Sequence, residues 1–308
     1  RPAIDKNLFS LATVSDFLDN PDFNLDAFYA QNELSLESIK SKRELQYSNP
    51  AVLEIQNLSK VYSDKGFFGK GTEIKALDKV SLELFQGESL GIVGESGCGK
   101  STLSKCIIQL EKQTQGDVIY QGENIESLLS ENPLAYRKSI QMIFQDPASA
   151  LNPKMRIGAI LVEVMKVHSI GKNNSDRKQK AIDLLEKVGL EAEHFSRYPH
   201  EFSGGQKQRI GIARALALEP KIIICDESVS ALDVSVQAQV LNLLNELKEV
   251  FSLSYIFISH DLSVVKHFCD RIIVLNNGKI EEEGFPEELV EDAKSEYTKR
   301  LIESIPGI

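Results

Sequence analysis

The sequence has few cysteines, no long apolar segment and no excess of basic charge, and each of these absences argues against a class of protein. Its four cysteines form no C-x-x-C pair, so we expect neither a disulfide framework nor a cysteine-based metal site, and a reducing compartment is favoured. No apolar run reaches the roughly 18 residues of a membrane-spanning helix. Acidic residues number 45 against 35 basic ones, and a net charge of −10 offers no basic field for nucleic acid.

The first 50 residues also lack glycine, and their apolar residues are intermittent. A polar helical stretch from Glu33 to Leu45 is expected to end at Ser48-Asn49-Pro50. We interpret residues 1–50 as a linker or tail, and the alternative is a flexible terminus with no role. The chain begins Arg1-Pro2, with neither Met nor a signal peptide, which predicts a fragment or a processed product.

The residues that are present are typical of a soluble globular protein, with 42% hydrophobic and 26% charged side chains among 308 residues. Short apolar stretches predict strands, and stretches with helical periodicity lie between them. The predicted strands include residues 52–58, 80–84, 221–227 and 255–259, and the predicted helices include 157–167, 176–188 and 234–250. This alternation favours an α/β fold with a largely parallel sheet.

One glycine-rich segment lies between an apolar strand, Ser89–Val93, and a helix that begins near Leu103. It matches the pattern G-x-x-x-x-G-K-[ST] with Gly94, Glu95, Ser96, Gly97, Cys98, Gly99, Lys100, Ser101 and Thr102. Glycines let the backbone N–H groups wrap around an anion, and the helix N-terminus adds further donors. We prefer this interpretation to a plain glycine turn. It predicts binding of a nucleoside triphosphate, with Lys100 on the β- and γ-phosphates and Ser101 on Mg²⁺.

Two acids, Asp226 and Glu227, end a buried apolar strand. Parallel-sheet proteins bind their ligands at this end of their strands. We expect Asp226 to hold Mg²⁺ through its water shell, and Glu227 to polarise a water for attack on the γ-phosphate. The alternative is that two acids merely end a strand, and the phosphate loop upstream argues against it.

The order of further motifs points to a family. Ser203-Gly204-Gly205-Gln206 resembles the signature motif of ATP-binding cassette (ABC) ATPases, and it stands after Gln145 and before Asp226. Ser230-Ala231-Leu232-Asp233 and His260 follow it. The resemblance covers roughly residues 52–305. It implies a P-loop NTPase (RecA-like) core with an antiparallel β subdomain and an α-helical insert subdomain.

The resemblance also implies domain boundaries. An ABC ATPase domain is expected over residues 51–285, with its helical subdomain at about 146–208. A linker from a preceding cassette would occupy residues 1–50, and a C-terminal helical extension residues 286–308. Phe202 and Ser228 depart from the usual Leu and Pro of the family pattern, but neither change removes a ligand.

By the same resemblance, each motif has an expected role. Tyr62 would stack on adenine, Gln145 would sense Mg²⁺ and the attacking water, and His260 would contact the γ-phosphate. Two cassettes of this family face each other head to tail, so Ser203–Gln206 would serve the partner's ATP and Asp233 would bridge the cassettes. One copy alone is expected to bind ATP but to hydrolyse it poorly. The remaining histidines are expected to be structural or solvated: His168, His194, His200 and His267.

Several longer stretches resemble the ATP-binding subunits of dipeptide and oligopeptide importers: Phe144–Pro153, Tyr198–Phe202, Val229–Gln237 and Tyr297–Leu301. Arg1–Asp5 and Thr13–Leu18 resemble the connector of importer ATPases with two fused cassettes. The implied protein hydrolyses ATP with Mg²⁺ at the cytoplasmic face of the plasma (inner) membrane. Its implied partners are a second cassette, fused or in a homodimer, transmembrane permease subunits and, indirectly, a substrate-binding protein. Nucleic acid is not expected.

Two alternatives belong to other classes. A soluble ABC ATPase of DNA repair or translation would carry a long coiled-coil or zinc-binding insertion, or a basic arm. The stretch from Asn152 to Phe202 is too short for such an insertion, and the chain is acidic. A regulatory cassette that binds ATP without hydrolysing it is disfavoured because Glu227 and His260 are both present.

Overall fold

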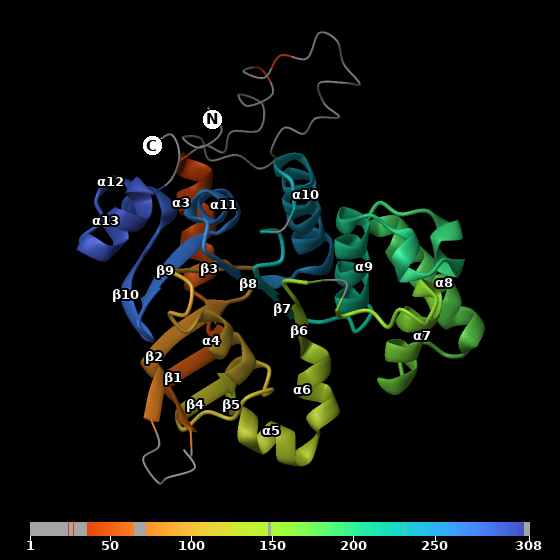
Figure 1. Ribbon diagram of the computed structural model, residues 1–308, viewed down its shortest axis with the longest axis horizontal. Coiled ribbons are helices and arrows are strands. Elements are labelled where there is room, and N and C mark those ends of the chain that lie inside the picture. Colours follow the sequence, from red (N-terminus) through yellow and green to blue (C-terminus); the bar gives the residue numbers. More distant parts are fainter. Residues whose placement is uncertain are drawn as a thin grey trace. The chain divides into compact units, whose positions relative to one another are not determined.

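The computed structural model describes residues 36–64, 72–146, 149–230 and 232–304, together with Asn24 and Ala27. The described residues form two compact units, the first of residues 36–136 and 254–304 and the second of residues 137–253 (Figure 1). The predicted linker lies largely outside the described residues. Its last part forms helix α3 (Leu36–Tyr47), whose bounds lie close to those of the helical stretch predicted from Glu33 to Leu45.

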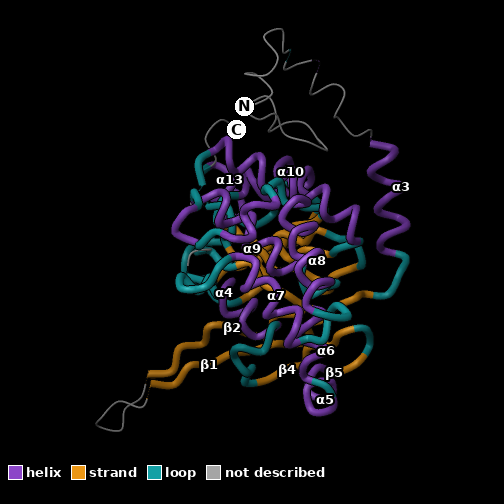
Figure 2. The backbone as a smooth tube through the Cα atoms, turned by 90° about the vertical axis from the view of Figure 1, so that its right-hand side faces the viewer, coloured by secondary structure: helices purple, strands orange, loops and turns teal. Residues whose placement is uncertain are grey.

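The first unit contains an antiparallel sheet with the strand order β2-β1-β4-β5. Its strands are β1 (Ala51–Asp64), β2 (Thr72–Phe85), β4 (Gln115–Tyr120) and β5 (Glu123–Asn124). Leu53 pairs with Leu84 and is fully buried, as the alternation of apolar and polar residues predicts. Both β1 and β2 are longer than predicted, and Figure 2 shows them running together as a long ribbon.

The second group of strands in this unit has the order β10-β9-β3-β8. They are β3 (Ser89–Val93), β8 (Ser254–Ser259), β9 (Arg271–Asn276) and β10 (Lys279–Gly284). Strand β3 lies between β8 and β9 and runs parallel to both. All residues of β3 and β8 are buried, which explains their continuous apolar sequences. Strands β9 and β10 form an antiparallel hairpin.

The first unit also contains α-helices before, between and after these strands. They are α4 (Lys100–Ile107), α5 (Ile125–Glu131), α6 (Pro133–Ser139, which ends in the second unit), α11 (Leu262–Phe268), α12 (Pro286–Glu291) and α13 (Glu296–Glu303). Helix α11 packs on β3 and β8. Helix α3 is attached through Arg43, which forms a bidentate ion pair with Glu287 of α12.

The second unit pairs two parallel strands, β6 (Ile140–Ile143) and β7 (Ile222–Asp226). Its α-helices are α7 (Ile157–Val167), α8 (Asn174–Lys187), α9 (Gly204–Leu216) and α10 (Val234–Phe251), with 3-10 turns η2 (Ala192–Ser196) and η3 (Pro199–Glu201). Both units combine strands with helices, so the predicted α/β fold is confirmed. No helix of the described part is both long and apolar enough to cross a membrane.

Candidate functional site

The glycine-rich loop connects β3 to α4, as predicted. Gly94 has a φ of 155°, and a Cβ atom at this position would lie 2.1 Å from the carbonyl oxygen of Leu275 in β9. Only glycine therefore fits here. At the other end of the loop, the N–H of Gly278 donates to the carbonyl of Cys98 at 2.8 Å. The β9–β10 hairpin thus supports the loop, a role that no local sequence signal indicates.

Lys100 is 4% exposed, and its ammonium group lies inside the loop. The Nζ atom donates to the carbonyl oxygens of Gly94 at 2.7 Å and Glu95 at 2.9 Å. The buried thiol of Cys98 lies 3.8 Å from the same nitrogen. Burial raises the pKa of this thiol, so it is protonated at neutral pH. The loop therefore presents one cation in a setting of backbone groups, which suits a phosphate.

Three other residues predicted to contact ATP or Mg²⁺, namely Ser101, His260 and Tyr62, lie in the same unit. Ser101, in the first turn of α4, is exposed. Val93 pairs with Ser259, so Gly94 and His260 leave neighbouring parallel strands at the same edge. Tyr62 lies on β1, 37% exposed, with the Lys60 ammonium 4.9 Å from its ring centroid. Its exposed ring can stack on a base.

The second unit brings together three further predicted site residues, Gln145, Asp226 and Glu227. Ile143 of β6 pairs with Cys225 of β7 in parallel strands. Gln145 and Asp226 therefore lie at the same edge of this pair of strands. The side-chain amide of Gln145 donates to Glu227 Oε2 at 3.1 Å. Asp226 is 8% exposed, whereas Glu227 adopts the left-handed conformation with a φ of 47°. Glu227 is half-buried, so the two adjacent carboxylates differ in burial.

The signature residues form the N-terminus of α9. Ser203 Oγ accepts from the N–H of Gln206 at 3.3 Å, and the Gln206 side chain accepts from the N–H of Ser203 at 3.0 Å. This reciprocal capping box stabilises the start of the helix. Gly205 is required by packing, because a Cβ there would lie 2.6 Å from Val236 Cγ1 of α10. At Gly204, by contrast, a Cβ would meet no atom of the described residues within 4 Å.

Asp233 stands at the start of α10, where its carboxylate accepts a hydrogen bond from the N–H of Val236 at 3.0 Å. It is therefore the N-cap of this helix in the chain itself. Since Asp233 is exposed, capping leaves room for a second contact from outside the unit. The capping role does not exclude the bridging role that the resemblance implies.

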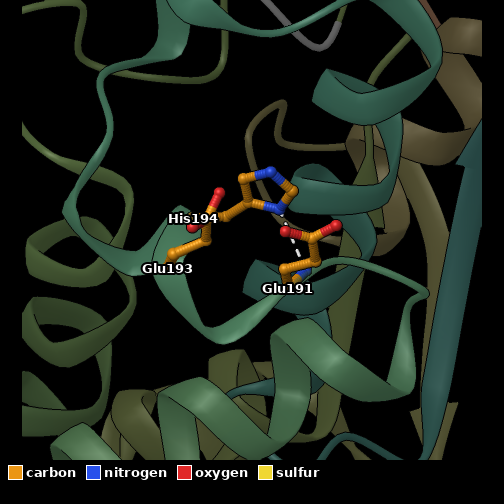
Figure 3. Close-up of side chains that lie close together, drawn as sticks. All are labelled: Glu191, Glu193 and His194. Atoms are coloured by element: carbon orange, nitrogen blue, oxygen red, sulfur yellow. Dashed lines mark hydrogen bonds between the residues drawn. The ribbon is translucent and has the colours of Figure 1, made fainter.

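Glu191, Glu193 and His194 place their ligand atoms within 4.8 Å of one another and are the described residues that most resemble a metal site (Figure 3). His194 Nδ1, however, already accepts from the N–H of Glu191 at 2.9 Å. The Glu193 carboxylate forms an ion pair with Arg197. Two of the three potential ligands, His194 and Glu193, are therefore engaged in holding the 3-10 turn η2, which fits the structural role predicted for His194.

The second unit also has a cavity of about 250 Å³, and no predicted site residue lines it. Apolar side chains make up most of its lining, and the charged groups among the lining residues have partners in the chain. Lys180 pairs with Glu219 at 3.9 Å, and the Lys187 ammonium lies 4.7 Å from the ring centroid of Phe251. We therefore do not assign it a ligand.

Comparisons with known proteins point to one family. Residues 77–230 match the ABC transporter family. The oligopeptide transport ATP-binding protein OppF of Bacillus subtilis is 49% identical over 83% of this chain and 82% of its own length. The dipeptide transport ATP-binding protein DppF of Haemophilus influenzae is 46% identical over 84% of this chain and 80% of its own.

A solved structure of the ATP-binding cassette MJ0796, a dimer in a post-hydrolysis state with ADP and Pi, resembles the fold. It has a TM-score of 0.67 and 30% sequence identity, and the match covers 76% of this chain and 98% of that one.

Proposed function

This chain belongs to the ABC transporter family, and we propose that it is the ATP-hydrolysing subunit of a peptide importer. The observation that carries the proposal is the identity of 46–49% with oligopeptide and dipeptide transport ATP-binding proteins over more than four fifths of the chain. The relatives favour transport over the alternative of a soluble ABC ATPase in DNA repair or translation.

We assign the phosphate loop, with Lys100, to the triphosphate, Tyr62 to the adenine and His260 to the γ-phosphate. The Ser101 hydroxyl, the Gln145 amide and the Asp226 carboxylate are the oxygen donors for Mg²⁺, a hard cation that prefers such ligands. When bound, Mg²⁺ neutralises charge that develops on the phosphate oxygens. Glu227 takes the proton of the attacking water, and its hydrogen bond from Gln145 orients it for this role.

The signature residues act on the ATP of a partner cassette. The space at Gly204 supports this assignment, because the chain's own packing does not require a glycine there. The N-terminus of α9, with the Ser203 hydroxyl and backbone N–H groups, suits a γ-phosphate. The partner is a second cassette, fused or in a homodimer, and Asp233 contacts it. ATP then holds two cassettes together and hydrolysis separates them.

In this proposal the protein is peripheral to the cytoplasmic face of the membrane, where it contacts permease subunits that receive solute from a binding protein. Residues 51–285 are the ATPase domain, with the helical subdomain at about 146–208. Residues 1–50 are the linker, and residues 286–308, which include α12 and α13, are the C-terminal extension.

Uptake of a labelled tripeptide tests the proposal in cells that produce the chain with its own permeases. Lys100→Ala should abolish both ATP binding by the purified chain and peptide uptake. The matched control is Lys105→Ala, on the exposed face of the same helix, which should change neither. Undiminished uptake with a Lys100→Ala chain that no longer binds ATP would contradict the proposal.

A further inference from the structure

The C-terminal helix α13 contacts the phosphate loop through one tyrosine. Tyr297 is 7% exposed, and its hydroxyl accepts a hydrogen bond from the backbone N–H of Glu95 at 2.9 Å. The two residues are 202 positions apart in the sequence and belong to the same compact unit. Tyr297 also lies outside residues 77–230, which match the family.

The backbone around Glu95 is the part of the loop that Lys100 also contacts. Lys100 Nζ donates to the carbonyl oxygens of Gly94 and Glu95, at 2.7 and 2.9 Å. Tyr297 accepts from the N–H of Glu95. Donor and acceptor groups at the start of the loop therefore have defined partners. A peptide plane fixed in this way limits the directions in which the following N–H groups can point.

Tyr297 is itself held in place from β10. The Glu282 carboxylate accepts from the N–H groups of Lys294 at 2.8 Å and Ser295 at 3.1 Å. Ser295 Oγ accepts from the N–H of Tyr297 at 3.1 Å and so caps α13. Helices α12 and α13 pack on β10 (Figure 1).

The strands that carry this anchor also carry the loop. Strand β10 pairs with β9, and β9 pairs in parallel with β3, the strand that leads into the loop. The hydroxyl of Tyr297 and the start of the loop are therefore placed by the same hydrogen-bonded sheet. The β9–β10 turn holds the other end of the loop through the bond from Gly278 to Cys98.

We propose that Tyr297 is a positioning residue for the phosphate loop, and that α13 thereby forms part of the support of the ATP site. The inference rests on the proposed function, since it requires that the loop binds ATP. By fixing the Glu95 peptide, Tyr297 holds the empty loop in the conformation that accepts the triphosphate. Binding of ATP therefore requires less ordering of the loop. Tyr297 makes no contact with ATP in this proposal.

The test is Tyr297→Phe, which keeps the ring and removes only the hydroxyl. Loss of one net hydrogen bond should raise the dissociation constant for ATP about five-fold, measured by calorimetric titration of the purified chain with Mg²⁺ present. In turnover assays, KM for ATP should rise by about the same factor while kcat changes less than about two-fold. Amide exchange at Glu95 should become faster in the nucleotide-free protein.

Tyr47→Phe is the matched control. It removes another partly buried hydroxyl in the same unit. This hydroxyl donates to Glu88 with a distance of 3.1 Å, and it does not contact the phosphate loop. It should leave the ATP dissociation constant at the parent value. Equal ATP affinity of Tyr297→Phe and the parent would overturn the inference, as would an equal loss of affinity in both variants. Absence of ATP binding by the parent chain would instead overturn the proposed function.

Discussion

The side-chain amide of Gln145 donates a hydrogen bond to the carboxylate of Glu227, with 3.1 Å between nitrogen and oxygen. The two residues are 82 positions apart, and each follows one of two paired parallel strands. The orientation of Glu227 therefore depends on the loop that carries Gln145. A residue proposed as general base is held by a residue proposed to sense Mg²⁺, so the two roles are coupled by direct contact.

Glu227→Gln should abolish ATP hydrolysis and leave ATP binding intact. The glutamine has nearly the same shape and can still accept from Gln145, but it cannot take a proton. Loss of a general base lowers turnover by about 10²–10⁴-fold. Phosphate release and ATP titration measure the two effects. Glu219→Gln, an exposed acid of the same unit, is the control and should keep parent turnover. Unchanged turnover in Glu227→Gln would show that Glu227 is not the general base.

Gly205→Ala and Gly204→Ala should separate packing from function in the signature motif. At Gly205 the added methyl group would lie 2.6 Å from Val236 Cγ1, so we expect a loss of about 1–3 kcal/mol in the free energy of unfolding. At Gly204 the methyl group meets open space, so stability should be unchanged or slightly higher. Urea unfolding measures both.

The functional effect of Gly204→Ala is measured as the ATPase activity of the assembled dimer. Gly204→Ala should lower it, because the methyl group occupies space that we assign to the partner's ATP. A Gly204→Ala protein that is stable and fully active in the dimer would contradict this assignment.

Arg271→Met should strongly destabilise the first unit. The Glu88 side chain is completely buried and accepts from Arg271 Nε at 2.8 Å. Removing the cation leaves a buried carboxylate with hydrogen bonds from Tyr47 and the Phe85 N–H but no opposite charge, which costs roughly 3–5 kcal/mol. Lys299→Met is the control, because its ion pair with Glu296 is exposed and should contribute little to stability. A loss in Arg271→Met no larger than in the control would contradict the prediction.

Glu282→Gln should destabilise the docking of α13 in a pH-dependent way. Although burial opposes the shift, hydrogen bonds from the backbone N–H groups of Lys294 and Ser295 lower the pKa of Glu282 below 4.5. A carboxylate with a lowered pKa contributes stability that is complete above its unfolded-state pKa and is lost as the pH falls through its folded-state pKa. The Tm difference between parent and Glu282→Gln should be full at pH 7 and narrow below pH 4.5. A difference that stays constant or widens on acidification would contradict this.

Features with a local cause could be predicted well. The helix expected at residues 157–167 is α7, with the same first and last residues. The phosphate loop lies between strand and helix, and Asp226 ends β7, because glycine spacing and continuous apolar runs depend on neighbouring residues only. Strand length was predicted less well. Strand β1 continues to Asp64 and strand β2 already begins at Thr72, because the pairing between them continues beyond the segments with alternating apolar and polar residues.

The identity of the family was thus determined by the sequence itself, through short motifs whose order along the chain is informative, and the same motifs predict the roles of individual side chains. Only the tertiary structure decided what holds those motifs in place. The carbonyl of Leu275 at Gly94, the hydroxyl of Tyr297 at Glu95 and the amide of Gln145 at Glu227 come from distant segments. Their alignment depends on strand pairing and helix docking, and such through-space contacts leave no periodic or compositional trace in one sequence.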